Sequence, residues 1–176
     1  MEEALSFRPA VPADAPGLVL FVNAAYRGDS SKRGWTTEAD LLDGQRTDDG
    51  KMSEMIEGDG SRVELAFDDA GRLAACVYLR KEASGACYLG MLTVDPGRQA
   101  SGLGRRMLAH SEEVAKAWGC DRVRMTVIDV RAELLAWYER RGYARSGATE
   151  PFPDNPRFGL PKVPDLRFAE LVKELR

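Results

Sequence analysis

Hydrophobic residues recur along this chain with two different periods, and the period predicts the element that each segment forms. Apolar residues at every second position predict strands at 5–11, 62–67, 72–80, 87–94, 122–128, 143–149 and 166–172. Apolar residues at helical spacing predict helices at 14–25, 52–57, 103–118 and 131–141. A further helix is predicted from an N-cap at Thr36 or Thr37 to Gly44, and the proline-rich segment 151–164 is expected to be irregular.

The order of these elements predicts the fold class. A short Asp/Gly turn at 68–71 joins two strands as an antiparallel hairpin. Strand 87–94, the long helix after it and strand 122–128 form a crossover unit, which makes those two strands parallel. We therefore expect a single α+β, sandwich-like domain over residues 3–174, with helices flanking a mixed, mostly antiparallel sheet.

Composition narrows the functional classes. The chain has 176 residues, of which 44% are hydrophobic and 30% charged, as in ordinary globular domains. The net charge of −3 and the pI of about 5.4 disfavour a nucleic-acid partner. The acidic N-terminus predicts no signal peptide, and no apolar run approaches the roughly 18 residues of a membrane span. We expect a cytoplasmic protein without a membrane partner.

The cysteines and the single histidine predict no metal site. Cys76, Cys87 and Cys120 lie far apart among apolar neighbours, so we expect buried thiols rather than a disulfide framework or a zinc site. His110 falls on the polar side of its helix, where we expect it to be solvated.

The segment between strand 87–94 and the next helix carries the strongest chemical signal. Gly102 and Gly104 open that helix, so backbone can approach a ligand closely and the free N–H groups of the first turn form an anion site. Three arginines add positive charge nearby: Arg98, Arg105 and Arg106. The alternative is that the glycines only turn the chain. A Walker loop is excluded because arginine follows Gly104, whereas a dinucleotide fingerprint remains open although Met107 replaces its third glycine.

Two motifs in this region resemble the GNAT superfamily of acyl-CoA-dependent N-acetyltransferases. Gln99-Ala100-Ser101-Gly102-Leu103-Gly104 resembles its acyl-CoA pyrophosphate loop. The segment 134–143 resembles its second motif, in which an apolar helix ends in Tyr-Glu-x-x-Gly-Phe/Tyr. One strand separates the motifs, as in that superfamily, and the order of elements matches over nearly the whole chain.

This resemblance implies acetyl transfer from acetyl-CoA, as cosubstrate, to a primary amine by direct attack in a ternary complex. It also implies a central parallel strand pair that splays apart, and a homodimer as a common assembly. Tyr138 would protonate the leaving thiolate. The alternative reading makes Tyr138 a core aromatic beside Leu134 and Leu135; Trp137 and Tyr143 are expected in the core. The residues implied in cofactor binding are Leu92, Thr93, Val94, Gln99, Ala100, Ser101, Gly102, Leu103, Gly104 and Arg105.

The acceptor side is less defined. The residues expected to bind a small-molecule or peptide amine are Trp35, Glu38, Arg46 and Phe158. No residue declares itself the general base, and the candidates are Glu38, Glu64, Glu82 and Tyr88. Asp129 stands where many members of the superfamily have an asparagine, and either caps the following helix or contacts the cofactor. The alternative function is a non-catalytic acyl-CoA-binding module.

Overall fold

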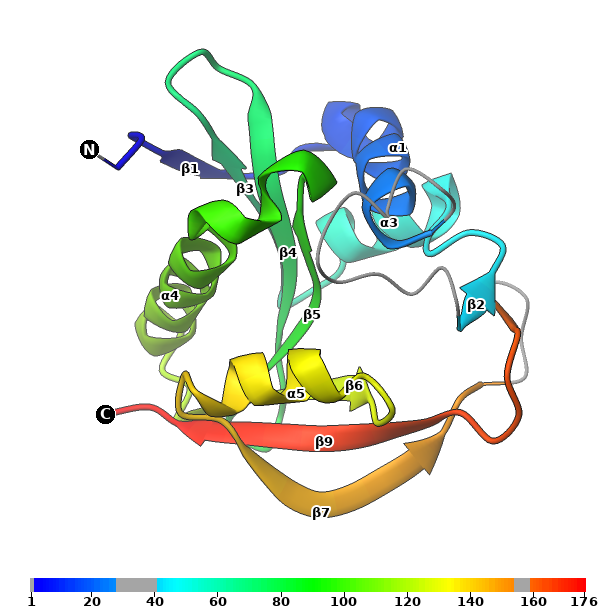
Figure 1. The fold of residues 1–176 in the computed structure, drawn as a ribbon. Coiled ribbons are helices and arrows are strands. Elements are labelled where there is room, and N and C mark those ends of the chain that lie inside the picture. Colours follow the sequence, from blue (N-terminus) through cyan, green and yellow to red (C-terminus); the bar gives the residue numbers. More distant parts are fainter. Residues whose placement is uncertain (1, 28–40, 154–158) are drawn as a thin grey trace.

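A mixed sheet forms the centre of the computed structural model, which describes residues 2–27, 41–153 and 159–176 (Figure 1). In spatial order, the strands of this sheet are β1 (Ser6–Pro9), β3 (Ser61–Phe67), β4 (Leu73–Lys81), β5 (Ala86–Val94), β6 (Arg122–Ile128), β9 (Arg167–Glu174) and β7 (Ala144–Pro151). Among these described strands only β5 and β6 are parallel neighbours, and the other neighbouring pairs are antiparallel. The predicted α+β fold is confirmed.

Helices cover both faces of the sheet (Figure 1). The α-helices of the described ranges are α1 (Ala15–Tyr26), α3 (Asp49–Glu57), α4 (Leu103–Ala117) and α5 (Ala132–Glu139), with 3₁₀ turns η1 (Pro12–Asp14) and η2 (Pro96–Ser101). Strand β4 separates two layers of core because its side chains alternate. Val77 and Leu79 pack with α4 and α5, whereas Cys76 packs with α1 and α3. Burial on both faces explains why this strand reads as nearly continuous hydrophobic sequence.

The predicted helix ending at Gly44 is wrong at its C-terminal end. Leu42–Asp43 forms a short strand, β2, which pairs with β8 (Leu160–Pro161). Leu42 is buried against Ile128 and Leu166, so a distant part of the chain provides the contacts that local sequence could not indicate. The start of the predicted helix, at Thr36 or Thr37, lies outside the described residues.

Strands β5 and β6 pair over a short length only. Residues 86–88 align with residues 122–124, and beyond them the two strands diverge (Figure 1). A bulge lies in the diverging half of β5, because Met91 and Leu92 together face Val77 of β4. Met91 adopts a φ of +55°, a left-handed conformation that a non-glycine residue rarely takes. The expected splayed parallel pair is therefore present, and it leaves one edge of β5 without a strand neighbour.

The cysteines are buried as predicted. Burial raises the pKa of the Cys76 and Cys87 thiols to about 12, and burial also raises that of Cys120. No helix within the described ranges is long and apolar enough to cross a membrane.

Replacing Leu79 by alanine should destabilise the fold because this side chain is fully buried between β4 and α4. We expect the free energy of unfolding to fall by roughly 2–5 kcal/mol, measured by urea denaturation. Leu20→Ala is the matched control, since Leu20 is 74% exposed on α1 and its loss should change stability by less than about 0.5 kcal/mol. Equal effects of the two substitutions would contradict the assigned core.

The buried thiols should react slowly in the native protein. At pH 8, a thiol with a pKa of about 12 is almost entirely protonated, and the thiolate is the reactive form. We expect an aromatic disulfide reagent to modify the native chain at least about tenfold more slowly than the chain in guanidinium, where all thiols are exposed. Fast modification of native protein at pH 8 would show that a cysteine is accessible.

Candidate active site

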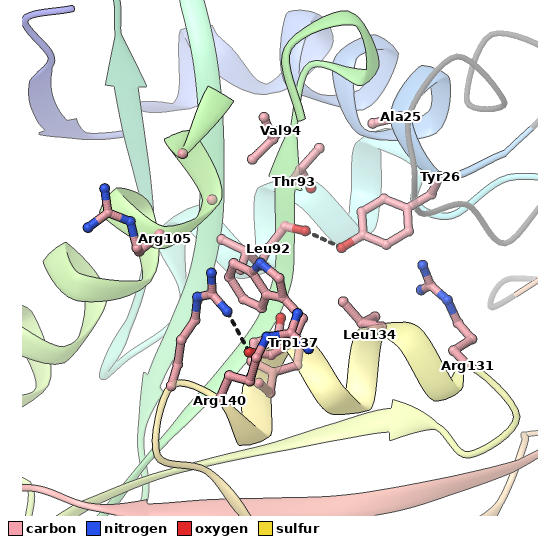
Figure 2. Close-up of a pocket in the computed structure, with 14 residues that line it drawn as sticks. Ala25, Tyr26, Leu92, Thr93, Val94, Arg105, Arg131, Leu134, Trp137 and Arg140 are labelled. Carbon is pink, nitrogen blue, oxygen red and sulfur yellow. Dashed lines mark hydrogen bonds between the residues drawn. The ribbon is translucent and has the colours of Figure 1, made fainter. Parts of the chain in front are cut away.

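A cavity of about 330 Å³ opens between the start of α4, the diverging half of β5, and α5 (Figure 2). We call it the cofactor cavity. Gly102, at its edge, has a φ of +84°, which allows the sharp entry into α4. A Cβ on Gly104 would lie 3.4 Å from the Trp137 ring and 3.6 Å from Val94, so a side chain there would enter the cavity. The positive φ therefore explains the glycine at residue 102, and the position beside the cavity favours a small residue at 104.

The start of α4 supplies backbone donors to this cavity. The N–H of Arg106 makes the first hydrogen bond of the helix, to the carbonyl of Gly102 at 3.1 Å. The three N–H groups before it, those of residues 103–105, have no acceptor within the helix. Together with the helix dipole, these N–H groups are the donors that the expected anion site would use.

Arginines give the cofactor cavity a positive charge. Its lining includes Arg105, Arg131, Arg140 and Arg141, and none of the described lining residues is acidic. Arg141 donates a hydrogen bond to the Trp137 carbonyl at 2.7 Å and stacks 3.9 Å above that indole ring. Its Nε is buried without a hydrogen-bond partner. Burial lowers the pKa of Arg141, and the charges of Arg140 and Arg105 lower it further. A polyanionic ligand would relieve this repulsion.

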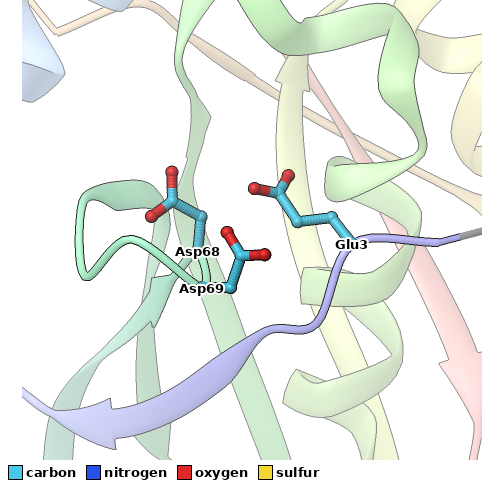
Figure 3. Close-up of side chains that lie close together, drawn as sticks. All are labelled: Glu3, Asp68 and Asp69. Atoms are coloured by element: carbon cyan, nitrogen blue, oxygen red, sulfur yellow. The ribbon is translucent and has the colours of Figure 1, made fainter.

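All three arginines expected here bond to the N-terminal segment. Arg98 bonds to the carboxylates of Glu3 at 2.5 Å and Asp68 at 3.2 Å, and Arg106 donates to the Glu3 carbonyl at 2.6 Å. Arg105, which lines the cavity, pairs with Glu2 at 3.2 Å. The expectation that Arg98 and Arg106 add positive charge to this site is therefore not supported, because Glu3 and Asp68 occupy their guanidinium donors. The carboxylates of Glu3, Asp68 and Asp69 gather within 4.8 Å of one another (Figure 3). Arg98 supplies the counter-charge for two of these three.

A second cavity, of about 510 Å³, lies in the space where β5 and β6 diverge. We call it the acceptor cavity. Its other walls come from the C-terminal end of α1, from α3, α5 and β4, from the end of β7 with the two residues after it, and from the start of β9. The residues that line both cavities are Tyr26, Leu92, Arg131, Leu134 and Tyr138. The hydroxyl of Tyr26 donates to the Leu92 carbonyl, which anchors the bulge of β5 at this junction (Figure 2). Two ligands, one in each cavity, would thus meet beside the bulge.

Tyr138 lies at this junction and also belongs to the core. Its side chain is 5% exposed, with ring contacts to Trp137 and Tyr143. Burial raises the pKa of its phenol far above the ordinary value, and Tyr26 adds to this effect while Arg131 and Arg141 oppose it. The phenol is consequently neutral over the ordinary pH range. The two readings of Tyr138, core aromatic and cavity residue, are compatible.

The other predicted cofactor residues divide between the cavity wall and its support. Leu92, Thr93, Val94 and Arg105 line the cofactor cavity with the two glycines. Leu103 is buried in the core and the Ser101 hydroxyl donates to the Arg98 carbonyl at 2.5 Å, so these two offer backbone rather than side chains. The side chains of Gln99 and Ala100 lie outside the described part of the structure.

On the acceptor side, Arg46 and Tyr88 line the acceptor cavity. Trp35, Glu38 and Phe158 lie outside the described residues. Glu82 is not among the residues that line either cavity, and it bonds instead to Arg124 at 2.5 and 2.8 Å.

Glu64 and His110 form a separate pair, in which Glu64 is buried and His110 is partly buried. The Nε2 of His110 lies 2.8 Å from the Glu64 Oε2, and the imidazole stacks on Phe7 at 4.1 Å between ring centroids. The expectation of a solvated His110 was wrong, because β1 and β3 cover this side of α4. Neither residue lines the described cavities.

Asp129 does not cap α5. The N-cap of this helix is Arg131, without a side-chain cap, and Asp129 lines neither cavity.

Four residues that line the cavities were not predicted from the sequence: Tyr26, Arg131, Arg140 and Arg141. The sequence did contain an indication of Arg140 and Arg141, because they occupy the two variable positions of the Tyr-Glu-x-x-Gly motif.

Comparisons with known proteins agree with this geometry. The family model described as "Acetyltransferase (GNAT) family" matches residues 31–143. The mycothiol acetyltransferase of Beutenbergia cavernae is 33% identical over 104 residues, which is 58% of this chain and 33% of that protein. The mycothiol acetyltransferase of Salinispora tropica is 31% identical over 148 residues, 81% of this chain and 45% of the relative. The chain thus spans less than half the length of these relatives.

A solved structure shares the whole fold. The ribosomal-protein-S18-alanine N-acetyltransferase of Escherichia coli superimposes with a TM-score of 0.71, covering 98% of this chain and 94% of that one. Its sequence identity to this chain is 15%, so this likeness concerns the fold.

Gly104→Val should narrow the cofactor cavity, because a Cβ here already contacts Trp137 and Val94 and the two methyl groups would extend beyond it. We expect the Kd for CoA to rise by about tenfold or more, equivalent to roughly 1.4 kcal/mol, in isothermal titration calorimetry. Ala109→Val is the control, as Ala109 is exposed on the same helix. Unchanged CoA affinity in Gly104→Val would remove this cavity from the cofactor role.

Proposed function

Because the chain belongs to the acetyltransferase (GNAT) family, we propose that it transfers an acetyl group from acetyl-CoA to a primary amine. The amine would attack the thioester directly, within a ternary complex. The observation that carries this proposal is the meeting of the two cavities at shared residues beside the β5 bulge. An acyl donor in one cavity and an amine in the other would have their reacting atoms in the same place.

The cofactor cavity fits a ligand with a pyrophosphate and a long polar arm. The N–H groups at the start of α4 would hold the pyrophosphate, with Arg105, Arg140 and Arg141 supplying positive charge. The edge of β5 that β6 leaves unpaired after Tyr88 offers backbone groups to the pantetheine arm, as an added strand would use them. Thr93 and Val94 lie on this edge and line the cavity.

In the reaction, the amine nitrogen forms a bond to the thioester carbonyl carbon and gives up one proton to a base or to water, and the carbon–sulfur bond breaks with its electron pair on sulfur. A proton from water then restores the acid that protonates the thiolate. A backbone N–H at Val94 would stabilise the negative charge on the carbonyl oxygen. The Tyr138 phenol would give its proton to the leaving thiolate, and its raised pKa keeps that proton available at every ordinary pH. Of the described base candidates, Tyr88 is the one that lines the acceptor cavity.

The acceptor is proposed at the level of a small-molecule or peptide amine. We do not carry over the substrate of the mycothiol acetyltransferases, because the chain spans less than half of their length. A homodimer and a cytoplasmic location belong to this proposal as expectations, and size-exclusion chromatography with light scattering tests the first.

Tyr138→Phe should remove the proton donor and leave the ring that packs in the core. We expect kcat for thiol release to fall by about 10²-fold or more, while the Kd for acetyl-CoA changes less than about threefold. Tyr143→Phe is the matched control, because the Tyr143 hydroxyl bonds to Glu112 at 3.0 Å and its residue lines neither cavity. Equal turnover in Tyr138→Phe and Tyr143→Phe would exclude Tyr138 as the acid.

A thermal-shift screen, combined with the thiol-release assay, separates the alternative functions. Thermal stabilisation by acetyl-CoA without thiol release across a broad amine panel would favour a non-catalytic acyl-CoA-binding module. Stabilisation by NAD rather than CoA would favour a dinucleotide site.

A further inference from the structure

Basic side chains outnumber acidic ones among the described residues that line the acceptor cavity. Among its described lining residues, two are acidic, Glu54 and Glu150. The basic residues that line it are Arg27, Arg46, Lys51, Arg80, Arg124 and Arg131. Arg27, Lys51 and Arg131 each have a further interaction within the protein, so these three do not by themselves define a ligand site.

Two of the basic side chains, Arg80 and Arg124, are paired with carboxylates of the protein itself. Arg124 bonds to Glu82 at 2.5 and 2.8 Å and lies 3.5 Å from Glu170, while Arg80 lies 3.6 Å from Glu82. The two guanidinium groups hold the Tyr88 ring between them, at 5.1 and 5.0 Å from its centroid. These arginines are therefore committed to the protein's own groups and do not require a ligand.

Arg46 differs from these two arginines. Its guanidinium lies 5.3 Å above the Tyr26 ring, and within the described part of the chain no carboxylate forms an ion pair with it. The Arg46 backbone N–H, not the side chain, makes the 2.6 Å bond to Asn23 Oδ1. The planar set of guanidinium donors is thus available for a carboxylate or phosphate, which it can bind through two parallel hydrogen bonds.

The position of Arg46 relates this anion site to the reaction. Arg46 stacks on Tyr26, and Tyr26 lines both cavities beside the Leu92 carbonyl. A ligand whose anionic group meets Arg46 would therefore extend toward the junction where acetyl transfer is proposed.

We propose that the acceptor is an amine that also carries an anionic group, a carboxylate or a phosphate, and that Arg46 binds this group. The inference rests on the proposed acetyl transfer and names its substrate class. It selects amino acids and phosphorylated amines over neutral amines and polyamines.

The test compares matched acceptors in the thiol-release assay with acetyl-CoA. The pairs are β-alanine with β-alaninamide and O-phosphoethanolamine with ethanolamine, and spermidine represents polycations. We expect the anionic member of at least one pair to exceed its neutral partner in kcat/KM by about tenfold or more. The pair that shows the preference distinguishes carboxylate from phosphate. A better kcat/KM for the neutral amines or spermidine would overturn the proposal.

Arg46→Gln should abolish this preference by raising KM for the anionic acceptor, and Arg46→Lys should retain part of it. Both variants keep the backbone bond to Asn23. Arg145→Gln is the control for loss of one positive charge, because Arg145 lies on β7, pairs with Glu139 and lines neither cavity. An undiminished preference in Arg46→Gln would assign the anion site elsewhere and contradict the role of Arg46.

A binding experiment separates this inference from the proposed function. If acetyl-CoA binds but no amine in the panel is acetylated, the acetyl-transfer proposal fails for these acceptors. Calorimetric titration of the CoA complex with succinate and with inorganic phosphate still measures the anion site. Binding that Arg46→Gln removes and Arg145→Gln preserves would support the site, whereas no binding, or equal binding in both variants, would overturn it.

Discussion

The short pairing of β5 with β6 is the constraint on which the rest of the site depends. These parallel strands share hydrogen bonds only near residues 86–88, and the bulge at Met91 turns the remaining half of β5 away. The divergence leaves space for the two cavities, which both adjoin the unpaired edge of β5. An edge with unsatisfied backbone groups is unfavourable when buried and empty, but it is suited to an extended polar ligand. The cost of the break is offset by extensive packing of α4 and α5 on one face and of α1 and α3 on the other.

The neighbours that the fold places beside each charged side chain, and not its position in the sequence, decide which ion pairs it forms. Arg98, Arg105 and Arg106 all bond to the N-terminal segment, and Arg98 also bonds to Asp68. The other arginines that line the cofactor cavity flank α5: Arg131 precedes this helix, and Arg140 and Arg141 follow it. Although the net charge is −3, basic side chains outnumber acidic ones among the described residues that line each cavity. Such local fields favour anionic ligands even on an acidic protein, because nearby charges dominate inside a partly closed cavity.

The junction of the cavities combines rigidity with reactivity. Tyr138 and Leu134 are held by the core through α5, and Tyr26 binds the bulge through the Leu92 carbonyl. Groups fixed in this way lose little additional freedom when ligands bind, which is the physical basis of preorganised catalysis. Burial also keeps the Tyr138 phenol protonated. The same burial therefore packs the ring into the core and retains the proton that the proposed transfer requires.

The sequence by itself determined the order and type of nearly all described elements, the parallel crossover, and the glycines at the start of α4. These features depend on local periodicity and backbone conformation, which short segments encode. It also identified Tyr138 and Arg46 as site candidates. Only the tertiary structure decided the partners: Leu42 forms a strand because β8 is beside it, His110 is covered by Phe7, and Arg98 turns to Glu3. The convergence of Arg46, Tyr26 and Arg131 likewise depends on contacts between segments far apart in the chain. A local pattern specifies which groups a segment offers, whereas burial and charge pairing depend on what the fold brings against them.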